Sequence, residues 1–188
     1  MLDHFGLLAP FYEKLIKPKI PEQLLRLAEF PSSGSLLDVG GGTGRVAQYF
    51  LGMAIDIIVT DISVEMLEQA KSKHGLNVVG SQSEMLPFQS NHFDRIIMVD
   101  ALHHVYDQSS TARDLWRVLK PGGRLIIEEP DLAKELVKLI AFAEKLALMR
   151  SHFLAPQEIA NLFSQFGATT QIERDGVIAW VVIDKQLK

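Results

Sequence analysis

The fold is decided by Leu36-Leu37-Asp38-Val39-Gly40-Gly41-Gly42-Thr43-Gly44-Arg45, where an apolar run passes directly into a set of glycines. Glycine permits positive φ, and its missing side chain lets a ligand lie against bare backbone. Asp61 follows about twenty residues later, the spacing at which an acid in a nucleotide-binding fold reaches ribose hydroxyls. The pattern predicts a strand, a tight loop and a helix that together bind an adenosine-containing ligand.

The glycine loop alone leaves two kinds of ligand open. Residues 42–47, Gly-Thr-Gly-Arg-Val-Ala, also fit the GxGxxA form of a dinucleotide fingerprint. Asp38 separates the two, because a carboxylate directly before the glycines repels a pyrophosphate and attracts the ammonium group of a methionine moiety. We therefore expect S-adenosylmethionine as the cofactor. A turn-stabilising carboxylate is the structural alternative for Asp38.

Short apolar runs alternate with helical patterns along the rest of the chain, as in a parallel sheet with helices on both faces. The predicted strands are Ser35–Val39, Ile55–Thr60, Asn77–Val79, Arg95–Val99, Arg124–Glu128, Thr170–Glu173 and Ile178–Ile183. Helices are predicted to start at Gly44, Ser63, Ser110 and Pro156, where capping residues, glycine or proline precede apolar positions. Glycine turns at 120–123 and 166–167 precede the fifth and sixth strands. The fold class is therefore α/β, a Rossmann-like, doubly wound sheet of seven strands.

Composition narrows the class of protein further. With 188 residues and 47% hydrophobic content, the chain has room for one sizeable core, so residues 1–188 are predicted to form a single domain. The net charge of −4, with basic residues scattered, argues against nucleic acid as a partner. The absence of cysteine excludes disulfides and thiolate metal sites, and no metal is expected. The first residues do not read as a signal peptide, so a cytoplasmic location is the expectation.

Two apolar segments lie outside this alternating pattern. One is the N-terminal helical segment 1–30, with Phe11 and Tyr12 in a helix over 5–16, and the other is a lid-like helical insertion over 132–153. Charged residues interrupt the insertion, so it does not read as a membrane span. Both segments could form a pocket for a hydrophobic small molecule such as a quinol ring, a fatty or terpenoid chain, or a small aromatic. They could equally close the core or form a dimer contact, and the oligomeric state is left open.

Four segments resemble the class I methyltransferases, in particular the group that includes the ubiquinone and menaquinone biosynthesis enzymes. They are LLDVGGGTGR, VTDISVEML, SEMLPFQSNHFDRIIMVDALHHV and LWRVLKPGGRLIIEEP, in the family's order. The resemblance implies a mostly parallel sheet whose last strand, near Trp180, is antiparallel. It also implies that the enzyme transfers a methyl group to a small-molecule or lipid-like acceptor.

The resemblance also assigns the cofactor site. The implied cofactor-binding residues are Asp38, Gly40, Gly41, Gly42, Gly44, Asp61, Ile62, Met66, Gln82, Ser83, Asp100 and Ala101. Asp61 would hold the ribose hydroxyls, while Ile62 and Met66 would pack on the adenine. Gln82 is a departure from the family, which usually places an acid there to accept from the adenine amino group. A glutamine carbonyl can accept the same hydrogen bond.

No catalytic residue is assigned, because methyl transfer requires chiefly that two reactants be held in line. A general base is needed only if the acceptor must lose a proton. The candidates for that base are His103, His104, Tyr106, Glu129, Asp131 and His152. We expect at most one of the adjacent pair His103 and His104 to face the pocket, and a histidine bonded to backbone is the structural alternative for each. His104 is our hypothesis for the base that acts on a hydroxyl acceptor.

Two other functions remain open from the sequence. A nicotinamide-dependent oxidoreductase agrees with the GxGxxA form and Asp61, although no Tyr-x-x-x-Lys pair is present. A non-catalytic protein that binds S-adenosylmethionine, or that has lost it and serves as a partner, agrees with Gln82.

Overall fold

The computed structural model describes residues 22–31, 33–132 and 152–187. The predicted helix over 5–16 lies outside these residues, as does nearly all of the lid-like insertion. The helices are α2 (Glu22–Ala28), α3 (Val64–Lys71), α4 (Gln108–Val118) and α6 (Pro156–Ser164), with short 3-10 helices η1 (Ala47–Phe50) and η2 (Leu102–His104). The strands are β1 (Ser35–Val39), β2 (Asp56–Asp61), β3 (Asn77–Gly80), β4 (Phe93–Val99), β5 (Leu119–Pro130), β6 (Thr169–Asp175) and β7 (Ile178–Asp184).

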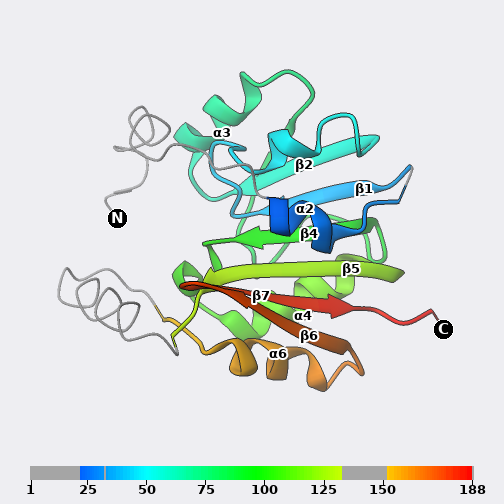
Figure 1. The fold of residues 1–188 in the computed structure, drawn as a ribbon. Coiled ribbons are helices and arrows are strands. Elements are labelled where there is room, and N and C mark those ends of the chain that lie inside the picture. Colours follow the sequence, from blue (N-terminus) through cyan, green and yellow to red (C-terminus); the bar gives the residue numbers. More distant parts are fainter. Residues whose placement is uncertain (1–21, 32, 133–151, 188) are drawn as a thin grey trace.

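The seven strands form one sheet in the order β3-β2-β1-β4-β5-β7-β6 (Figure 1). Strands β1 to β5 pair in parallel, and β7 runs antiparallel to both β5 and β6. The arrowheads of β4 and β7 accordingly point in opposite directions in Figure 1. The predicted doubly wound sheet with an antiparallel last strand is confirmed.

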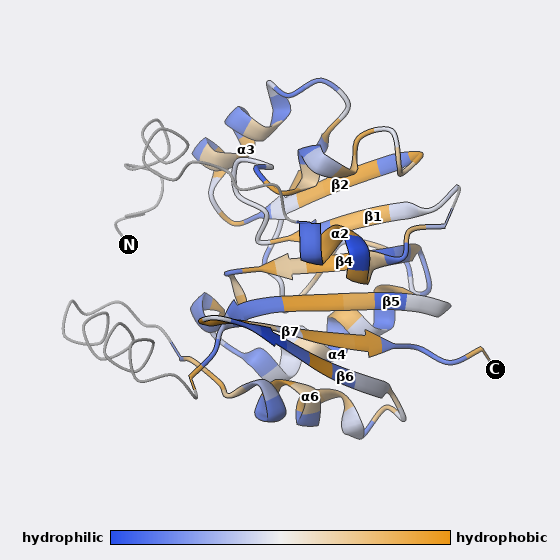
Figure 2. Ribbon diagram, in the orientation of Figure 1, coloured by the Kyte–Doolittle hydropathy of each residue, from blue (hydrophilic) through white to orange (hydrophobic). Residues whose placement is uncertain are grey.

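Side chains alternate between two cores, one on each face of the sheet. Along β1, Leu36 joins the core beneath α2 and α3, and Leu37 joins the core beneath α4 and α6. Ile96 and Ile97 of β4 divide in the same way. Successive side chains of a strand point to opposite faces, so the apolar runs of the central strands show that both faces are covered. Figure 2 shows these strands as hydrophobic and the edge strand β6 as largely hydrophilic, which protects the open edge from further pairing.

Three of the predicted helix starts agree with the structure. The Ser63 hydroxyl caps α3 by accepting from the Met66 amide, and α6 begins at Pro156. Helix α4 begins at Gln108, two residues before the predicted start, because Asp107 is its N-cap. The helix predicted to start at Gly44 is wrong: the chain continues in turns and then forms only η1. Gly52, at φ 84°, lies just beyond η1 and leaves little length before β2 begins.

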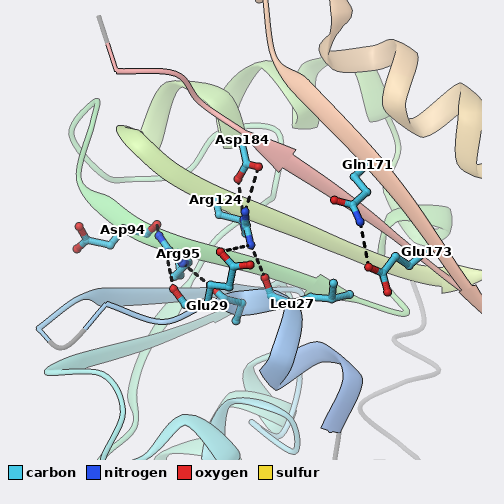
Figure 3. A network of polar contacts seen from close by, with 9 residues as sticks. Leu27, Glu29, Asp94, Arg95, Arg124, Gln171, Glu173 and Asp184 are labelled. Carbon is cyan, nitrogen blue, oxygen red and sulfur yellow. Dashed lines mark hydrogen bonds and ion pairs between the residues drawn. The ribbon is translucent and has the colours of Figure 1, made fainter.

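Helix α2 is held against the sheet by Arg95 of β4 and Arg124 of β5 (Figure 3). Arg95 donates to the carbonyls of Ala28 and Glu29, at 2.5 Å each, and Arg124 donates to the Leu27 carbonyl at 2.9 Å. Arg124 also forms two bonds to Asp184, of 2.7 and 3.1 Å. The arginines thus satisfy carbonyls at the end of a helix that is too short to be stable alone.

Candidate functional site

A cavity of about 1280 Å³ lies at the carboxyl ends of β1, β2 and β4. Strand β1 is the point where the chain order reverses, with β2 on one side and β4 on the other, and open α/β sheets bind ligands at such points. Of the predicted cofactor residues, those that line this central cavity are Asp38, Gly40, Gly41, Gly42, Asp61, Ile62, Met66, Gln82, Ser83, Asp100 and Ala101. Gly44 is not part of its lining among the described residues.

The glycine loop forms the floor of the cavity. Gly40 and Gly42 have φ of 68° and 54°, which favour glycine. A Cβ on Gly42 would lie 3.9 Å from its nearest neighbour, a distance that leaves the backbone open to a ligand. Gly44 has a different role, because a Cβ there would lie 2.6 Å from Leu76 Cδ1. It lets the loop pack against the chain that leads into β3.

Asp38 is a buried acid on the wall of the cavity. Its side chain is 1% exposed, and neither carboxylate oxygen has a hydrogen-bond partner within the described part of the chain. Burial raises the pKa of Asp38 from 3.8 to about 7, and the negative charge of Asp61 adds to the rise. The positive charge of Arg45, which also lines the cavity, acts in the opposite direction. A buried, unpaired carboxylate of this kind is suited to a cationic ligand.

Asp61 connects β2 to the glycine loop. One carboxylate oxygen accepts from the Gly42 amide at 2.9 Å, and the other accepts from the Ser63 amide at 2.8 Å. Each carboxylate oxygen can accept more than one hydrogen bond, so Asp61 can also accept from hydroxyl groups in the cavity. Next to it Ile62 is 73% exposed, whereas Met66 is buried beneath the loop. The exposed Ile62 side chain, next to Asp61, offers an apolar surface on which the adenine base of a nucleoside can pack.

The segment after β3 contributes both predicted and unpredicted residues. Gln82 is exposed and Ser83 is half-buried on the cavity wall. Glu84, which the sequence analysis did not single out, accepts from the amides of Tyr106 and Asp107 at 3.0 and 3.1 Å. It therefore fastens this segment to the loop that follows β4. Glu84 and Arg45 both stand within the motifs quoted above, but nothing in their spacing distinguished them.

The candidate bases fall into two groups. His104, Tyr106 and His152 line the central cavity. Among the residues the structure describes, the other three candidates lie outside that lining. His103 and Glu129 are buried and bonded to each other, with His103 Nδ1 2.6 Å from Glu129 Oε2. The buried Asp131 forms an ion pair with Arg174 at 3.2 Å.

Known proteins are similar to this chain over the segment that includes the glycine loop and Asp61. Residues 37–127 match a family model described as a methyltransferase domain. The ubiquinone/menaquinone biosynthesis C-methyltransferase UbiE of Edwardsiella ictaluri is 38% identical over 104 residues, which are 50% of this chain and 41% of that protein. Residues 37–127 therefore form a methyltransferase domain that resembles those of the class I S-adenosylmethionine-dependent enzymes. Because the match covers less than half of that relative's length, the relative's substrate does not transfer with it.

Solved structures support the fold of this methyltransferase domain. The YcgJ protein of Bacillus subtilis matches with a TM-score of 0.72 at 26% identity, over 81% of this chain and 69% of that one. A SAM-dependent methyltransferase from Thermotoga maritima matches with a TM-score of 0.81 at 21% identity, over 97% and 98% of the two chains. The latter likeness concerns the fold alone.

The residues of the central cavity fit S-adenosylmethionine, the cofactor of this class. The cofactor carries an ammonium group, for which the buried Asp38 carboxylate offers a counter-charge, and ribose hydroxyls, for which Asp61 offers acceptors. The open backbone at Gly42 leaves room for it to lie on the loop. When bound, it supplies a methyl group on a sulfonium, which is activated without help from the protein.

Proposed function

We propose that this chain transfers a methyl group from S-adenosylmethionine to a small, largely apolar acceptor that carries a ring hydroxyl, such as a reduced quinone. The proposal depends chiefly on Asp38, a buried and unpaired carboxylate beside an open glycine backbone. A pyrophosphate would place a second negative group against it, so the geometry disfavours a nicotinamide dinucleotide. The named activity of the UbiE relative supports the acceptor class.

The cavity has features that suit both parts of such an acceptor. Its volume of about 1280 Å³ exceeds the roughly 300–1,000 Å³ typical of a single small-ligand pocket, so it has space for two reactants. Tyr106 lines it and is 90% exposed, which offers an aromatic surface. His104 and His152 line it as well and offer imidazole nitrogens to a hydroxyl. The contribution of the insertion over 132–153 stays a prediction.

His104 is the proposed base. Removing the proton of a ring hydroxyl places electron density on the ring carbon beside it, and that carbon can then attack an electrophilic methyl group. The protein's remaining work is to bind, orient and exclude water. Within the described residues, none of the helices has the length and apolar character of a membrane span. The cytoplasmic location and the absence of a nucleic-acid partner stay predictions.

Two measurements test this function. Calorimetric titration should show binding of both S-adenosylmethionine and S-adenosylhomocysteine, and a complete absence of binding would favour the role of a non-catalytic partner. Transfer of labelled methyl from S-adenosylmethionine to a panel of aromatic diols, fatty acids and amines should then favour the diols. A His104→Ala protein that keeps full turnover with the best acceptor would dispose of His104 as the base.

A further inference from the structure

Glu129 is the last buried acid of β5, directly behind the turn that follows β4. Its Oε1 accepts from the amides of Ala101 and Leu102, at 3.1 and 2.7 Å, and its Oε2 lies 2.6 Å from His103 Nδ1. The side chains of Glu129 and His103 are only 5% and 4% exposed. Oε1 accepts from two amides, and we assign the donor role in the contact with Oε2 to His103 Nδ1, the usual arrangement of an imidazole beside a carboxylate. One buried carboxylate therefore holds three consecutive residues of the turn.

His103 connects this carboxylate to both histidines of the cavity wall. Its ring lies beside the His104 ring, with centroids 3.9 Å apart. The ring of Phe153 stacks on it as well, at 4.2 Å with an interplanar angle of 12°. The His103 carbonyl accepts from the His152 amide at 2.7 Å. A change in the position of His103 would therefore move His104 and the chain at 152–153 together.

Gln108 provides a second connection between the same two segments. Its side-chain amide donates to the carbonyl of Leu102 at 3.0 Å and to the carbonyl of His152 at 2.6 Å. The turn after β4 and the chain at His152 are separated by about fifty residues of sequence, yet they are fixed to each other from two sides. Rigid support of this kind is what a site needs when small displacements of a reacting group cost large factors in rate.

We propose that Glu129 and His103 are a positioning pair, which holds His104 and His152 side by side on the cavity wall so that both imidazoles face the acceptor hydroxyl. That the two imidazoles face an acceptor hydroxyl rests on the proposed function. Neither Glu129 nor His103 lines the cavity in the part of the chain described, so they act through the two cavity histidines and not on the acceptor itself.

The test compares pairs of variants that keep or remove the hydrogen bonds of Glu129 with His103 and the two amides. His103→Asn retains an amide N–H close to the position of Nδ1, whereas His103→Leu removes the donor. Glu129→Gln retains an acceptor for the two amides, whereas Glu129→Leu removes it. The readout is the ring nitrogen spectrum of protein labelled with 15N-histidine, without any ligand. We expect the His104 and His152 resonances to shift in both leucine variants and in Gln108→Leu, and to remain near wild type in Glu129→Gln. His103→Asn loses the ring beside His104 but keeps the bond to Glu129, so it should shift the His104 resonance less than His103→Leu does.

Methyl transfer to naphthalene-1,4-diol supplies the second readout. The leucine variants should lose about 10- to 100-fold in kcat, the range that follows from a displacement of about 1 Å. His103→Asn and Glu129→Gln should recover most of that loss. Asp184→Asn is the matched control, because it disrupts an anchor at the other end of the sheet and should move neither readout. If a leucine variant of the buried His103 or Glu129 does not fold, Gln108→Leu still tests whether the connection between the two segments positions the cavity histidines.

Three outcomes separate the claims. If the leucine variants lower Tm but leave the His104 and His152 resonances in place, the pair is only a stabilising contact and the inference is wrong. If the wild-type protein does not bind S-adenosylhomocysteine, the methyltransferase function fails while the spectra still report on the pair. If it binds but does not methylate the diol, the acceptor class is wrong and the positioning claim is judged by the spectra.

Discussion

At the scale of single residues, Asp38 makes the most specific prediction. In the cofactor-free protein its pKa is raised to about 7 from 3.8, so the folded state holds a proton that the unfolded state has lost. The contribution of Asp38 to the free energy of unfolding therefore falls as pH rises from about 4 to about 7, and stays low above that. Over these three pH units, the contribution of Asp38 to the free energy of unfolding falls by about 4 kcal/mol at most.

Replacing Asp38 with asparagine removes this titration. The free energy of unfolding of Asp38→Asn, relative to wild type, should rise by about 2–4 kcal/mol between pH 4 and pH 8. Urea denaturation of the cofactor-free proteins at several pH values measures the difference. Asp175→Asn, an exposed change at the end of β6, is the control for the substitution itself. An equal effect of Asp38→Asn at both pH values would contradict the burial argument.

Gln82 gives a second prediction at this scale. It lines the cavity and is exposed, at the place where the resembling enzymes usually carry an acid. A carboxylate forms a stronger, charge-assisted hydrogen bond with an adenine amino group than a neutral amide does. Gln82→Glu should therefore lower the Kd for S-adenosylhomocysteine by about threefold to tenfold, measured by calorimetry. Gln89→Glu adds the same charge at an exposed position outside the cavity lining and should leave Kd unchanged, so equal effects of the two would mean that only net charge matters.

At the scale of elements, the attachment of α2 can be tested with two arginines. Arg124 binds Asp184 through two nitrogens and also donates to the Leu27 carbonyl, with a side chain that is 18% exposed. Arg26 of α2 forms an ion pair with Glu173 at the same 2.7 Å, but its side chain is 62% exposed. Arg124→Gln should lower the free energy of unfolding by about 2–3 kcal/mol, and Arg26→Gln by less than about 0.5 kcal/mol. Equal losses in urea denaturation would show that burial does not set the strength of these contacts.

At the scale of the whole molecule, the central cavity draws residues from β1, β2 and β4 and from the segments that follow β3 and β4, so a ligand there should stabilise the sheet. A ligand at 100 times its Kd adds about 2.7 kcal/mol to the free energy of unfolding. For a chain of this size we expect Tm to rise by about 5–10 °C with S-adenosylhomocysteine. NADH at the same concentration should produce no rise. Stabilisation by NADH alone would end the methyltransferase assignment.

Local patterns in the sequence were enough to predict the sheet, and they also picked out most of the predicted cofactor residues that line the central cavity. The glycines of residues 40–44 and the acid at Asp61 are set by spacing along one strand–loop–strand unit, and the burial of β1 follows from its own apolar run. Such features depend on neighbours close in sequence, because backbone conformation and strand alternation are local properties. The same locality explains the errors. The helix expected at Gly44 is replaced by turns, because Gly44 has φ of 70°, outside the helical range, in a loop that packs against the distant Leu76.

The division of roles among the histidines was decided only by tertiary structure. His103 and His104 are adjacent, and no pattern in their own segment says which one faces the cavity. That choice is made by Glu129, which arrives from β5 and binds His103, and by Phe153, which arrives from beyond residue 151 and stacks on it. The sequence by itself determined that a glycine bend with an acid at Asp38 and another at Asp61 lies between two strands. Which side chains stand at the acceptor depends on hydrogen bonds and ring contacts between segments far apart in the chain, and those form only when the sheet is assembled.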